Sequence, residues 1–349
     1  MSTKKDKFSI KDKIFMELAL NLAKARHGLT GINPSVGCVI VKNNKILSIG
    51  QTGFKGTPHA EFNAIKNSHE NIEGSKMYVT LEPCSHYGKT PPCTNIIIKN
   101  KIKEVVYGVE DIDKKVKGKT LKILKSKNIL VKKNLLKKEI NKFYTPYFFN
   151  RKNNLPYVTG KIAISKNNLI YSKDTKRISD IHTDKFTHFL RYKNDSLMIS
   201  SKTLNKDDPK LNCRLEGLSK FSPKRIILDR NLEIKKNSYI FKTANKDNTI
   251  IFYHNAKAEV KLMLKKKGIT LIKSKLNKNS FDIKSILMKL YVLGCRNLLV
   301  EGGNDLSKHI IKKKLFNEFY LYKCAKSLSK LVNHKEFSFL NELKKNYKN

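Results

Sequence analysis

The sequence predicts two α/β domains in series, and three observations support this prediction. The chain has 349 residues, more than a single hydrophobic core usually serves. Short apolar runs alternate with amphipathic helical patterns in both halves, as in sheets covered by helices. The polar stretch Arg151-Lys152-Asn153-Asn154 interrupts this alternation and resembles a linker. We therefore expect one domain at residues 1–147 and a second at residues 148–349.

The first half begins with a predicted helix and a hairpin. Apolar residues at helical spacing predict a helix from near Asp12 to His27. The pair Asn43-Asn44 predicts a tight turn between two strands. A later helical stretch starts at Leu135 and is expected to end at Pro146, since proline disrupts a helix interior. Short apolar runs predict the remaining elements: strands at 36–41, 46–49, 76–80, 105–109 and 129–131, and helices that begin near residue 59 and after residue 118.

The second half repeats the alternation without an internal sequence repeat. Apolar runs predict strands at 157–164, 196–199, 225–228, 249–253 and 297–300. Helical patterns fall near 180–192, 256–267, 283–293 and 305–313. Strands separated by helices in this way predict a largely parallel sheet.

The large positive charge has a composition that argues against nucleic-acid binding. The formal net charge is +43, from 72 basic and 29 acidic residues. Only eight of the basic residues are arginine, the side chain on which nucleic-acid readers rely for bidentate contacts and stacking. The lysines are spread along the whole chain. We interpret most of the charge as a solvated surface and expect no nucleic-acid partner.

The sequence lacks the signals of a membrane or secreted protein. No apolar run approaches the ~20 residues of a membrane span. The N-terminus, residues 1–12, is charged and has no apolar core of the kind a secretory signal needs. We therefore expect a cytoplasmic protein without a membrane partner, whose six cysteines stay reduced.

Four residues of the first half form a zinc-deaminase pattern. His59 lies at the start of a predicted helix, Cys84 follows a predicted strand, and Cys93 comes nine residues later. A catalytic zinc takes three protein ligands and leaves a fourth position for water, which one imidazole and two thiolates satisfy. Glu61 supplies the carboxylate that moves protons without binding the metal. We predict that His59, Cys84 and Cys93 bind Zn²⁺ and that Glu61 is catalytic.

Two other interpretations of these residues stay open at this point. His59 could be a core histidine beside two buried thiols. The zinc could also be purely structural, with His86 as a fourth ligand, but Glu61 would then have no role.

The long gap between the two cysteines narrows the choice among deaminase families. Nucleoside and nucleic-acid deaminases usually place these cysteines as Cys-x-x-Cys, whereas eight residues separate Cys84 and Cys93. Together with Asn33-Pro34-Ser35-Val36-Gly37-Cys38-Val39-Ile40 and Pro58-His59-Ala60-Glu61, this loop resembles the bifunctional riboflavin-biosynthesis deaminase–reductases. The resemblance covers most of the chain. It implies a cytidine-deaminase-like α/β/α domain followed by a dihydrofolate-reductase-like α/β domain.

A glycine turn in the second half suggests a phosphate site. Val300-Glu301-Gly302-Gly303-Asn304-Asp305 runs from a predicted strand into a predicted helix, whose N-terminus can offer free N–H groups to a phosphate. A plain turn is the alternative. No Gly-x-Gly-x-x-Gly follows a strand, so a Rossmann site is not indicated. The resemblance implies that this turn contacts NADPH, and it also matches Lys161-Ile162-Ala163-Ile164-Ser165 and Asp207-Asp208-Pro209-Lys210-Leu211.

Matching position by position assigns further residues of the second domain. The resemblance implies that the phosphoribosyl substrate is contacted by Thr175, Arg191, Leu211, Arg214 and Glu301. It implies that the dinucleotide is contacted by Ala163, Arg177, Thr203, Asp207, Gly303, Asn304, Asp305, Leu306 and Ser307. Because arginine is rare in this chain, Arg191 and Arg214 are also candidate phosphate clamps from the residues alone, with surface cations as the alternative. The chain departs from the family at Arg177, where many relatives carry an aromatic residue, and at Ala325-Lys326-Ser327, which replaces Pro-Lys-Leu.

The resemblance implies two consecutive reactions on a small phosphoribosyl pyrimidine. Zinc-dependent hydrolysis would deaminate 2,5-diamino-6-(5-phosphoribosylamino)pyrimidin-4-one. NADPH would then reduce the ribosyl chain of 5-amino-6-(5-phosphoribosylamino)uracil. We also expect the protein to form a homo-oligomer. The first alternative is a deaminase whose second domain is degenerate. The second is a zinc deaminase that acts on nucleic acid, motivated by the net charge of +43.

Overall fold

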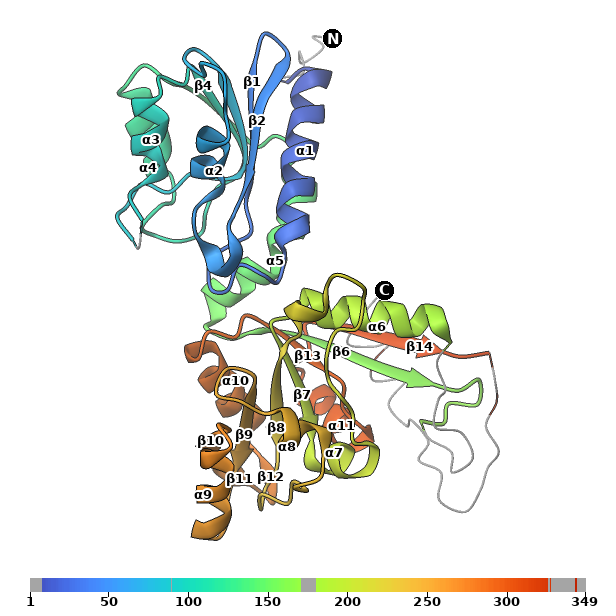
Figure 1. Cartoon of the computed structure of the whole chain (residues 1–349). Helices are drawn as coiled ribbons and strands as arrows, with labels where there is room; N and C mark the ends of the chain where they lie inside the picture. The colour runs from blue at the N-terminus through green and yellow to red at the C-terminus, as the bar shows by residue number, and fades with distance from the viewer. Residues whose placement is uncertain (1–7, 89, 171–179, 326, 328–342, 344–349) are drawn as a thin grey trace. The chain divides into compact units, whose positions relative to one another are not determined.

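The computed structural model describes residues 8–88, 90–170, 180–325, 327 and 343, which fall into two units (Figure 1). The first unit is Met1–Asn153 and the second is Asn154–Asn349. Each unit has a sheet and a buried apolar core of its own, as an independent domain requires. In the described part of the chain, no helix combines the length and the apolar character needed to cross a membrane.

A mixed five-stranded sheet forms the centre of the first unit. Its strands are β1 (Gly37–Lys42), β2 (Lys45–Gln51), β3 (Lys76–Leu81), β4 (Glu104–Val109) and β5 (Leu130–Lys133), in the order β2-β1-β3-β4-β5. β1 runs antiparallel to β2 and β3, whereas β3, β4 and β5 are parallel. Asn43 and Asn44 both have positive φ, which confirms the turn predicted between the first two strands. The carboxyl ends of β3 and β4 therefore lie at the same edge of the sheet.

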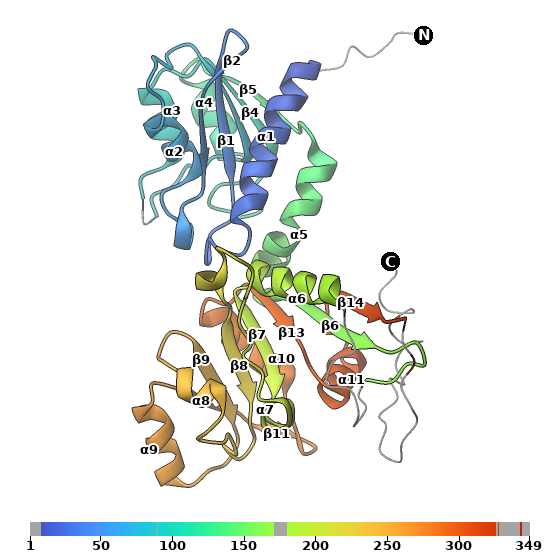
Figure 2. The same ribbon diagram turned by 45° about the vertical axis from the view of Figure 1, so that its right-hand side comes forward.

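Helices cover both faces of this sheet (Figures 1 and 2). α1 (Ile10–Arg26) and α5 (Lys137–Asn153) lie on one face, and α2 (Ala60–Lys66), α3 (Cys93–Lys99) and α4 (Lys119–Lys125) lie on the other. Two glycines permit close contact between helix and strand. A Cβ on Gly37 would lie 1.9 Å from the Ala19 carbonyl oxygen of α1, and one on Gly50 would lie 2.2 Å from the Ala60 carbonyl oxygen of α2. The unit therefore has the expected α/β/α layers.

Helix α5 corrects two expectations drawn from the sequence. It continues through Pro146, where the pattern predicts an end, and it includes Arg151–Asn153, which the pattern assigns to a linker. A proline costs the helix interior a hydrogen bond. However, the rings of Tyr144, Tyr147 and Phe148 contact one another along α5 in edge-on and tilted pairs, and all three pack in or against the core. This aromatic burial outweighs the lost hydrogen bond, so the helix runs to the end of the unit.

The second unit is built on a seven-stranded sheet in which every pair of neighbours is parallel. Its strands are β6 (Tyr157–Ile164), β7 (Ser196–Ser200), β8 (Lys224–Leu228), β9 (Thr249–Tyr253), β10 (Thr270–Lys273), β13 (Asn297–Val300) and β14 (Glu318–Lys323), in the order β10-β9-β8-β7-β13-β6-β14. A small hairpin, β11 (Leu276–Asn277) with β12 (Ser280–Phe281), lies outside this sheet. β13 is inserted between β7 and β6, which are consecutive in the chain. Open parallel sheets bind ligands at the carboxyl ends of strands around such a point.

Two apolar clusters show which helices cover which face of this sheet. Ile226 and Leu228 pack in one cluster with α10 (Ile283–Val292) and α11 (Asn304–Lys312). Ile227, between them on β8, packs in the other cluster with residues of α6 (Ile181–Lys193), α7 (Ser201–Asp207), α8 (Tyr239–Thr243) and α9 (Ala258–Lys266). The alternation of neighbouring side chains along a strand thus separates two helical layers. The second unit is an α/β domain, as predicted.

Candidate active sites

Three side chains that can bind a metal come together in the first unit. His59 precedes α2, Cys84 follows β3, and Cys93 begins α3. Their ligand atoms all lie within 4.8 Å of one another. His59 Nδ1 is 3.3 Å from Cys93 Sγ and 3.5 Å from Cys84 Sγ, and the Cys93 backbone N–H donates to Cys84 Sγ (3.2 Å). One imidazole nitrogen and two sulfurs in this arrangement fit Zn²⁺ with an open fourth position.

The three groups differ in how strongly they hold protons. A hydrogen bond from Cys93, assisted by His59, lowers the pKa of Cys84 to about 4 despite burial. The hydrogen bond to Cys84, together with burial, raises the pKa of Cys93 well above its usual value. The pKa of His59 is also raised, chiefly by its hydrogen bond with Cys84. Cys84 is therefore a thiolate at neutral pH, whereas Cys93 must lose a proton to bind a metal.

Glu61 lies in the first turn of α2, two residues after His59. Only 4% of its surface is exposed. Burial, with Cys84 as the next cause, raises the pKa of its carboxyl group. A buried carboxylate with a raised pKa beside the metal-binding side chains has the properties of a proton carrier.

The cluster opens into a cavity of about 250 Å³. His59, Glu61 and Cys84 line it. Further polar side chains complete the wall: Asn33, Thr52, Lys55, Thr57, Glu82, His86, Thr90, Asp111, Asp113, Tyr147 and Arg151. A concave site with several polar groups around a reactive centre can orient a small heterocycle.

Two of these wall residues, Asp111 and Tyr147, are not singled out by the sequence patterns. Tyr147 Oη on α5 donates to both carboxylate oxygens of Asp111 at 3.2 Å. Burial raises the pKa of Asp111. A usable signal exists for Asp111, because it follows β4, which lies beside the strand that leads to Cys84. Tyr147 could not be found, since the pattern ends its helix at Pro146.

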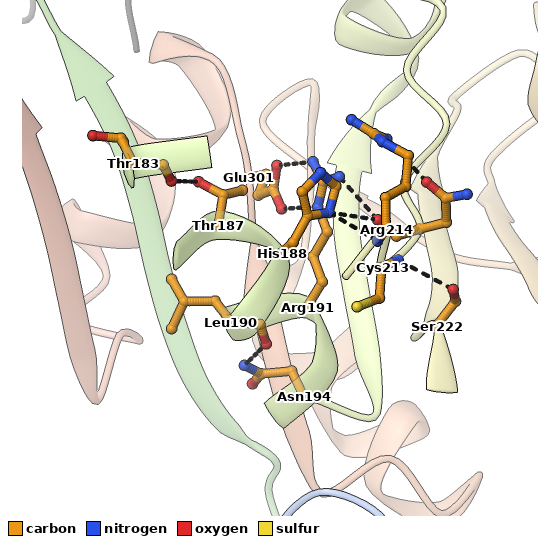
Figure 3. Close-up of polar contacts among 11 residues, drawn as sticks. Thr183, Thr187, His188, Leu190, Arg191, Asn194, Cys213, Arg214, Ser222 and Glu301 are labelled. Atoms are coloured by element: carbon orange, nitrogen blue, oxygen red, sulfur yellow. Dashed lines mark hydrogen bonds and ion pairs between the residues drawn. The ribbon is translucent and has the colours of Figure 1, made fainter. Parts of the chain in front are cut away.

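The second unit contains a buried ion pair between two of the residues matched to the substrate (Figure 3). Arg191 on α6 donates from Nε and Nη2 to the two carboxylate oxygens of Glu301, both at 2.7 Å. Glu301 directly follows β13. Burial opposes ionisation of Glu301, but Arg191 overcomes it and holds the pKa of that carboxyl below its usual value. The Nε and Nη2 groups of Arg191 are therefore paired with a carboxylate.

Arg214 and Leu211 lie on the segment that follows α7. Arg191 Nη1 donates to the Asn212 carbonyl oxygen (3.1 Å), and Arg214 Nη1 donates to Asn212 Oδ1 (3.0 Å). Leu211 is buried and has φ +51°, an uncommon conformation for a branched side chain. Unlike Arg191, Arg214 is exposed.

The described residues matched to the dinucleotide lie on α7, on β6 and at the start of α11. Gly303 is the N-cap residue of α11, and four further matched residues, Asn304–Ser307, form the first turn of this helix. A Cβ added to Gly303 would lie 3.6 Å from Thr203 Oγ1 of α7. The buried Asn304 Oδ1 has no hydrogen-bond partner among the described residues. A helix N-terminus with free backbone N–H groups and a glycine beside them fits a phosphate-bearing cofactor.

The other matched residues are more scattered. Asp207 ends α7, and Ala163 lies on β6. Thr175, Arg177 and Lys326 lie outside the described residues.

Two families match successive parts of the chain. Residues 9–109 match the cytidine and deoxycytidylate deaminase zinc-binding region, and residues 156–328 match the RibD C-terminal domain. The riboflavin biosynthesis protein RibD of Aquifex aeolicus is 35% identical over 314 residues, which cover 89% of this chain and 86% of that protein. RibD of Bacillus amyloliquefaciens is 32% identical over 313 residues, 89% of this chain and 84% of that protein.

Solved structures resemble both units together. Acinetobacter baumannii RibD has a TM-score of 0.83 and 27% identity, covering 94% of this chain and 90% of that one. A Thermotoga maritima protein described as a diaminohydroxyphosphoribosylaminopyrimidine deaminase/5-amino-6-(5-phosphoribosylamino)uracil reductase has a TM-score of 0.78 and 29% identity, with the same coverage. The sequence and fold matches thus include His59, Cys84 and Cys93 of the first unit and the glycine turn of the second. This chain belongs to the RibD family and is a bifunctional enzyme of riboflavin biosynthesis, with a zinc-binding deaminase domain and an NADPH-dependent reductase domain.

Proposed function

We propose that the first unit deaminates 2,5-diamino-6-(5-phosphoribosylamino)pyrimidin-4-one and that the second reduces the resulting 5-amino-6-(5-phosphoribosylamino)uracil to its ribitylamino product. The observation that carries the first step is the cluster of His59, Cys84 and Cys93 beside the buried Glu61 in a cavity. The description of the Thermotoga maritima relative supports the choice of substrates.

In the deaminase site, we propose His59, Cys84 and Cys93 as the zinc ligands. Zinc supplies Lewis acidity that makes water nucleophilic near neutral pH. Glu61 takes a proton from the attacking water and delivers protons to the ring nitrogen and to the leaving amine, which departs as ammonia. The raised pKa of Glu61 suits this work, because the carboxyl must both accept and release a proton near neutral pH.

The structural-zinc alternative with His86 as fourth ligand is disfavoured. The described metal-binding cluster contains His59, Cys84 and Cys93, whereas His86 contributes to the cavity wall. A catalytic site keeps its fourth position for water, as this donor set does.

In the reductase site, we propose that Gly303–Ser307, Thr203, Asp207 and Ala163 hold the dinucleotide, and we retain Arg177 on resemblance alone. NADPH supplies the hydride, so the protein contributes mainly position. The first turn of α11 offers backbone N–H groups to a phosphate. The carboxyl ends of β6, β7 and β13 bring these residues to one edge of the sheet.

For the substrate we propose Arg191, Leu211, Arg214 and Glu301, with Thr175 retained on resemblance alone. Arg214 is the exposed cation and is proposed to contact the phosphate. Glu301 holds Arg191 in place through two hydrogen bonds of 2.7 Å. In this proposal the substrate phosphate contacts the Arg214 guanidinium, and the Arg191–Glu301 pair holds the adjacent part of the site in place.

Product analysis of the purified enzyme tests both steps together. Given the diaminopyrimidine substrate without NADPH, the enzyme is expected to release ammonia and accumulate the phosphoribosylaminouracil. With NADPH, the ribitylamino product should replace that intermediate with one NADPH oxidised per molecule. Ammonia release without NADPH oxidation would support the deaminase-only alternative, which the match of the RibD C-terminal domain disfavours.

We further propose a cytoplasmic homo-oligomer that acts on a small molecule and not on nucleic acid. All six cysteines are free, which suits a reducing compartment. Arginine accounts for only eight of 72 basic residues, which disfavours a nucleic-acid substrate. A salt-sensitive gel shift with single-stranded DNA or RNA would contradict the second point, and sedimentation measures the oligomeric state.

A further inference from the structure

His188 is a partly buried residue that lies between two arginines matched to the reductase substrate (Figure 3). It stands on α6 three residues before Arg191, so the two side chains share a face of the helix. Both reach the same short segment. His188 Nδ1 and Arg191 Nη1 each lie 3.1 Å from the Asn212 carbonyl oxygen. The backbone N–H of Arg214 points to His188 Nδ1 at 3.2 Å.

The two contacts of His188 Nδ1 exclude each other. If this nitrogen carries a hydrogen, it donates to the Asn212 carbonyl oxygen. It then cannot accept a hydrogen bond from the Arg214 N–H. If it carries a lone pair, it accepts from Arg214 and leaves the Asn212 oxygen to Arg191. The second arrangement gives the Arg214 N–H an acceptor and the Asn212 oxygen a donor. The neutral imidazole with a lone pair on Nδ1 is therefore the form that fits this segment.

The charges around His188 favour the same neutral form. Burial, followed by Arg191 and Arg214, lowers the pKa of His188, while the contact with the Asn212 carbonyl oxygen and, after it, Glu301 oppose this shift. Glu301, however, already pairs with Arg191. Among the described residues, Lys161 on β6 and Asp184 on α6 also act on that pair.

The segment Leu211–Arg214 is fixed by two further contacts, at Leu211 and Cys213, so the contact with His188 determines the position of Arg214 at its end. Leu211 anchors it in the core, and the Cys213 backbone N–H donates to Ser222 Oγ (3.1 Å). The Arg214 guanidinium bonds back to Asn212 Oδ1 (3.0 Å), so its direction depends on the local backbone. A change at the Arg214 N–H would therefore move the cation that follows it.

We propose that neutral His188 is a positioning residue of the reductase, which fixes the Asn212–Arg214 backbone and thereby aims Arg214 at the substrate phosphate. The aim toward phosphate rests on the proposed function of Arg214. The backbone contact stands independently of it. Protonation of His188 replaces the acceptor by a donor, releases the Arg214 N–H and weakens binding of the anionic substrate.

Substitution of His188 by alanine and asparagine tests the role in catalysis. In His188→Ala, KM for the phosphoribosylaminouracil should rise about tenfold, the effect of one hydrogen bond left unmade, while kcat and KM for NADPH stay near wild type. His188→Asn should restore most of the affinity, because its amide oxygen can take the place of Nδ1 as acceptor. His182→Asn, which changes an exposed histidine of the same helix, is the matched control. A wild-type KM in His188→Ala overturns the positioning role.

The pH profile separates titration of His188 from mere packing. As the pH falls through the pKa of His188, KM of the wild type should rise, whereas His188→Asn should lack that part of the rise. The substrate phosphate itself titrates with a pKa of about 6, so the comparison is the difference between the two enzymes at each pH. Identical profiles would overturn the protonation device.

A measurement without substrate distinguishes this inference from the proposed function. In the full-length protein, the amide resonance of Arg214 should titrate together with the ring of His188, and this titration should vanish in His188→Asn. An Arg214 amide that does not follow His188 overturns the inference. An amide that follows His188 while Arg214→Ala leaves KM unchanged upholds the contact and overturns the assignment of Arg214 to the phosphate.

Discussion

Glu61 is the single residue on which the proposed deamination depends most directly. Glu61→Gln keeps the shape of a side chain that is only 4% exposed but cannot carry protons. Ammonia release should fall about 10³-fold while bound zinc, measured by elemental analysis, stays at the wild-type level. Glu70→Gln changes an exposed carboxylate of the same unit and should keep full activity. Substantial residual deamination by Glu61→Gln would rule out its role as proton carrier.

The protonation of the ligands predicts how zinc binding depends on pH. The pKa values of Cys93 and His59 are raised in the metal-free protein, so these groups hold protons that zinc must displace. Apparent zinc affinity should therefore increase as the pH rises from about 6 to 8. Cys84, with a pKa of about 4, contributes little to this slope because it is already ionised. Competition with a chelator of known affinity measures the effect, and a flat profile would contradict the predicted proton release.

At this scale, the sequence predicts residues that are tied to a fixed spacing and misses those that tertiary structure brings in. His59, Cys84 and Cys93 are recognised because their spacing along the chain is itself a pattern, and the structure brings them together. Asp111 and His188 carry no such local pattern. Their surroundings come from α5 in one case and from the Asn212–Arg214 segment in the other. No sequence signal indicates that Glu301 pairs with Arg191, which the sequence suggests as a phosphate clamp.

Among the elements, the N-terminus of α11 offers a clean test of cofactor binding. A Cβ on Gly303 meets Thr203 Oγ1 only at 3.6 Å, an ordinary contact, so Gly303→Ala should leave the melting temperature unchanged. The added methyl group nevertheless occupies space beside the proposed dinucleotide. KM for NADPH should rise about tenfold, equivalent to about 1.4 kcal/mol. Lys312→Ala, at the far end of the same helix, is the control. An unchanged KM would argue against dinucleotide binding at this turn.

A different glycine should affect stability instead of binding. In Gly37→Ala, the new Cβ would lie 1.9 Å from the backbone oxygen of Ala19. Because the clashing atom belongs to the backbone, no side-chain rotation can relieve the clash. We expect the first unit to lose about 3 kcal/mol of stability as α1 is forced away from β1. Chemical denaturation of the full-length protein measures this change. Stability equal to that of wild type would mean that α1 does not pack on the sheet as described.

Most elements could be predicted because apolar patterns coincide with burial. The strand predicted at 157–164 is β6 residue for residue, and the other predicted strands agree with the structure to within one or two residues at most ends. The error at α5 arises because a local rule about proline competes with aromatic packing that only the tertiary structure reveals. Short helices such as α7 span only seven residues and lack a periodic pattern long enough to recognise.

At the scale of the whole molecule, separate cores predict that the two activities can be supplied by different chains. A Glu61→Gln protein should retain reduction, and an Arg214→Glu protein should retain deamination, because each change is confined to one unit. Mixed together, they should convert the diaminopyrimidine to the ribitylamino product, with the intermediate passing through solution. Chromatography of the products with NADPH present measures this. No product from the mixture, with both single activities intact, would indicate that the intermediate must stay within one molecule.

Helix α5 has a consequence for anyone who wishes to express the deaminase half alone. A fragment ending at residue 147 would cut through this helix and omit Arg151, a wall residue of the catalytic cavity. It would also leave Tyr147, the donor to Asp111, as a fraying terminal residue. A fragment that keeps the whole of α5 extends to Asn153, so a gene split at that position, and not at Pro146, should leave the wall of this cavity complete.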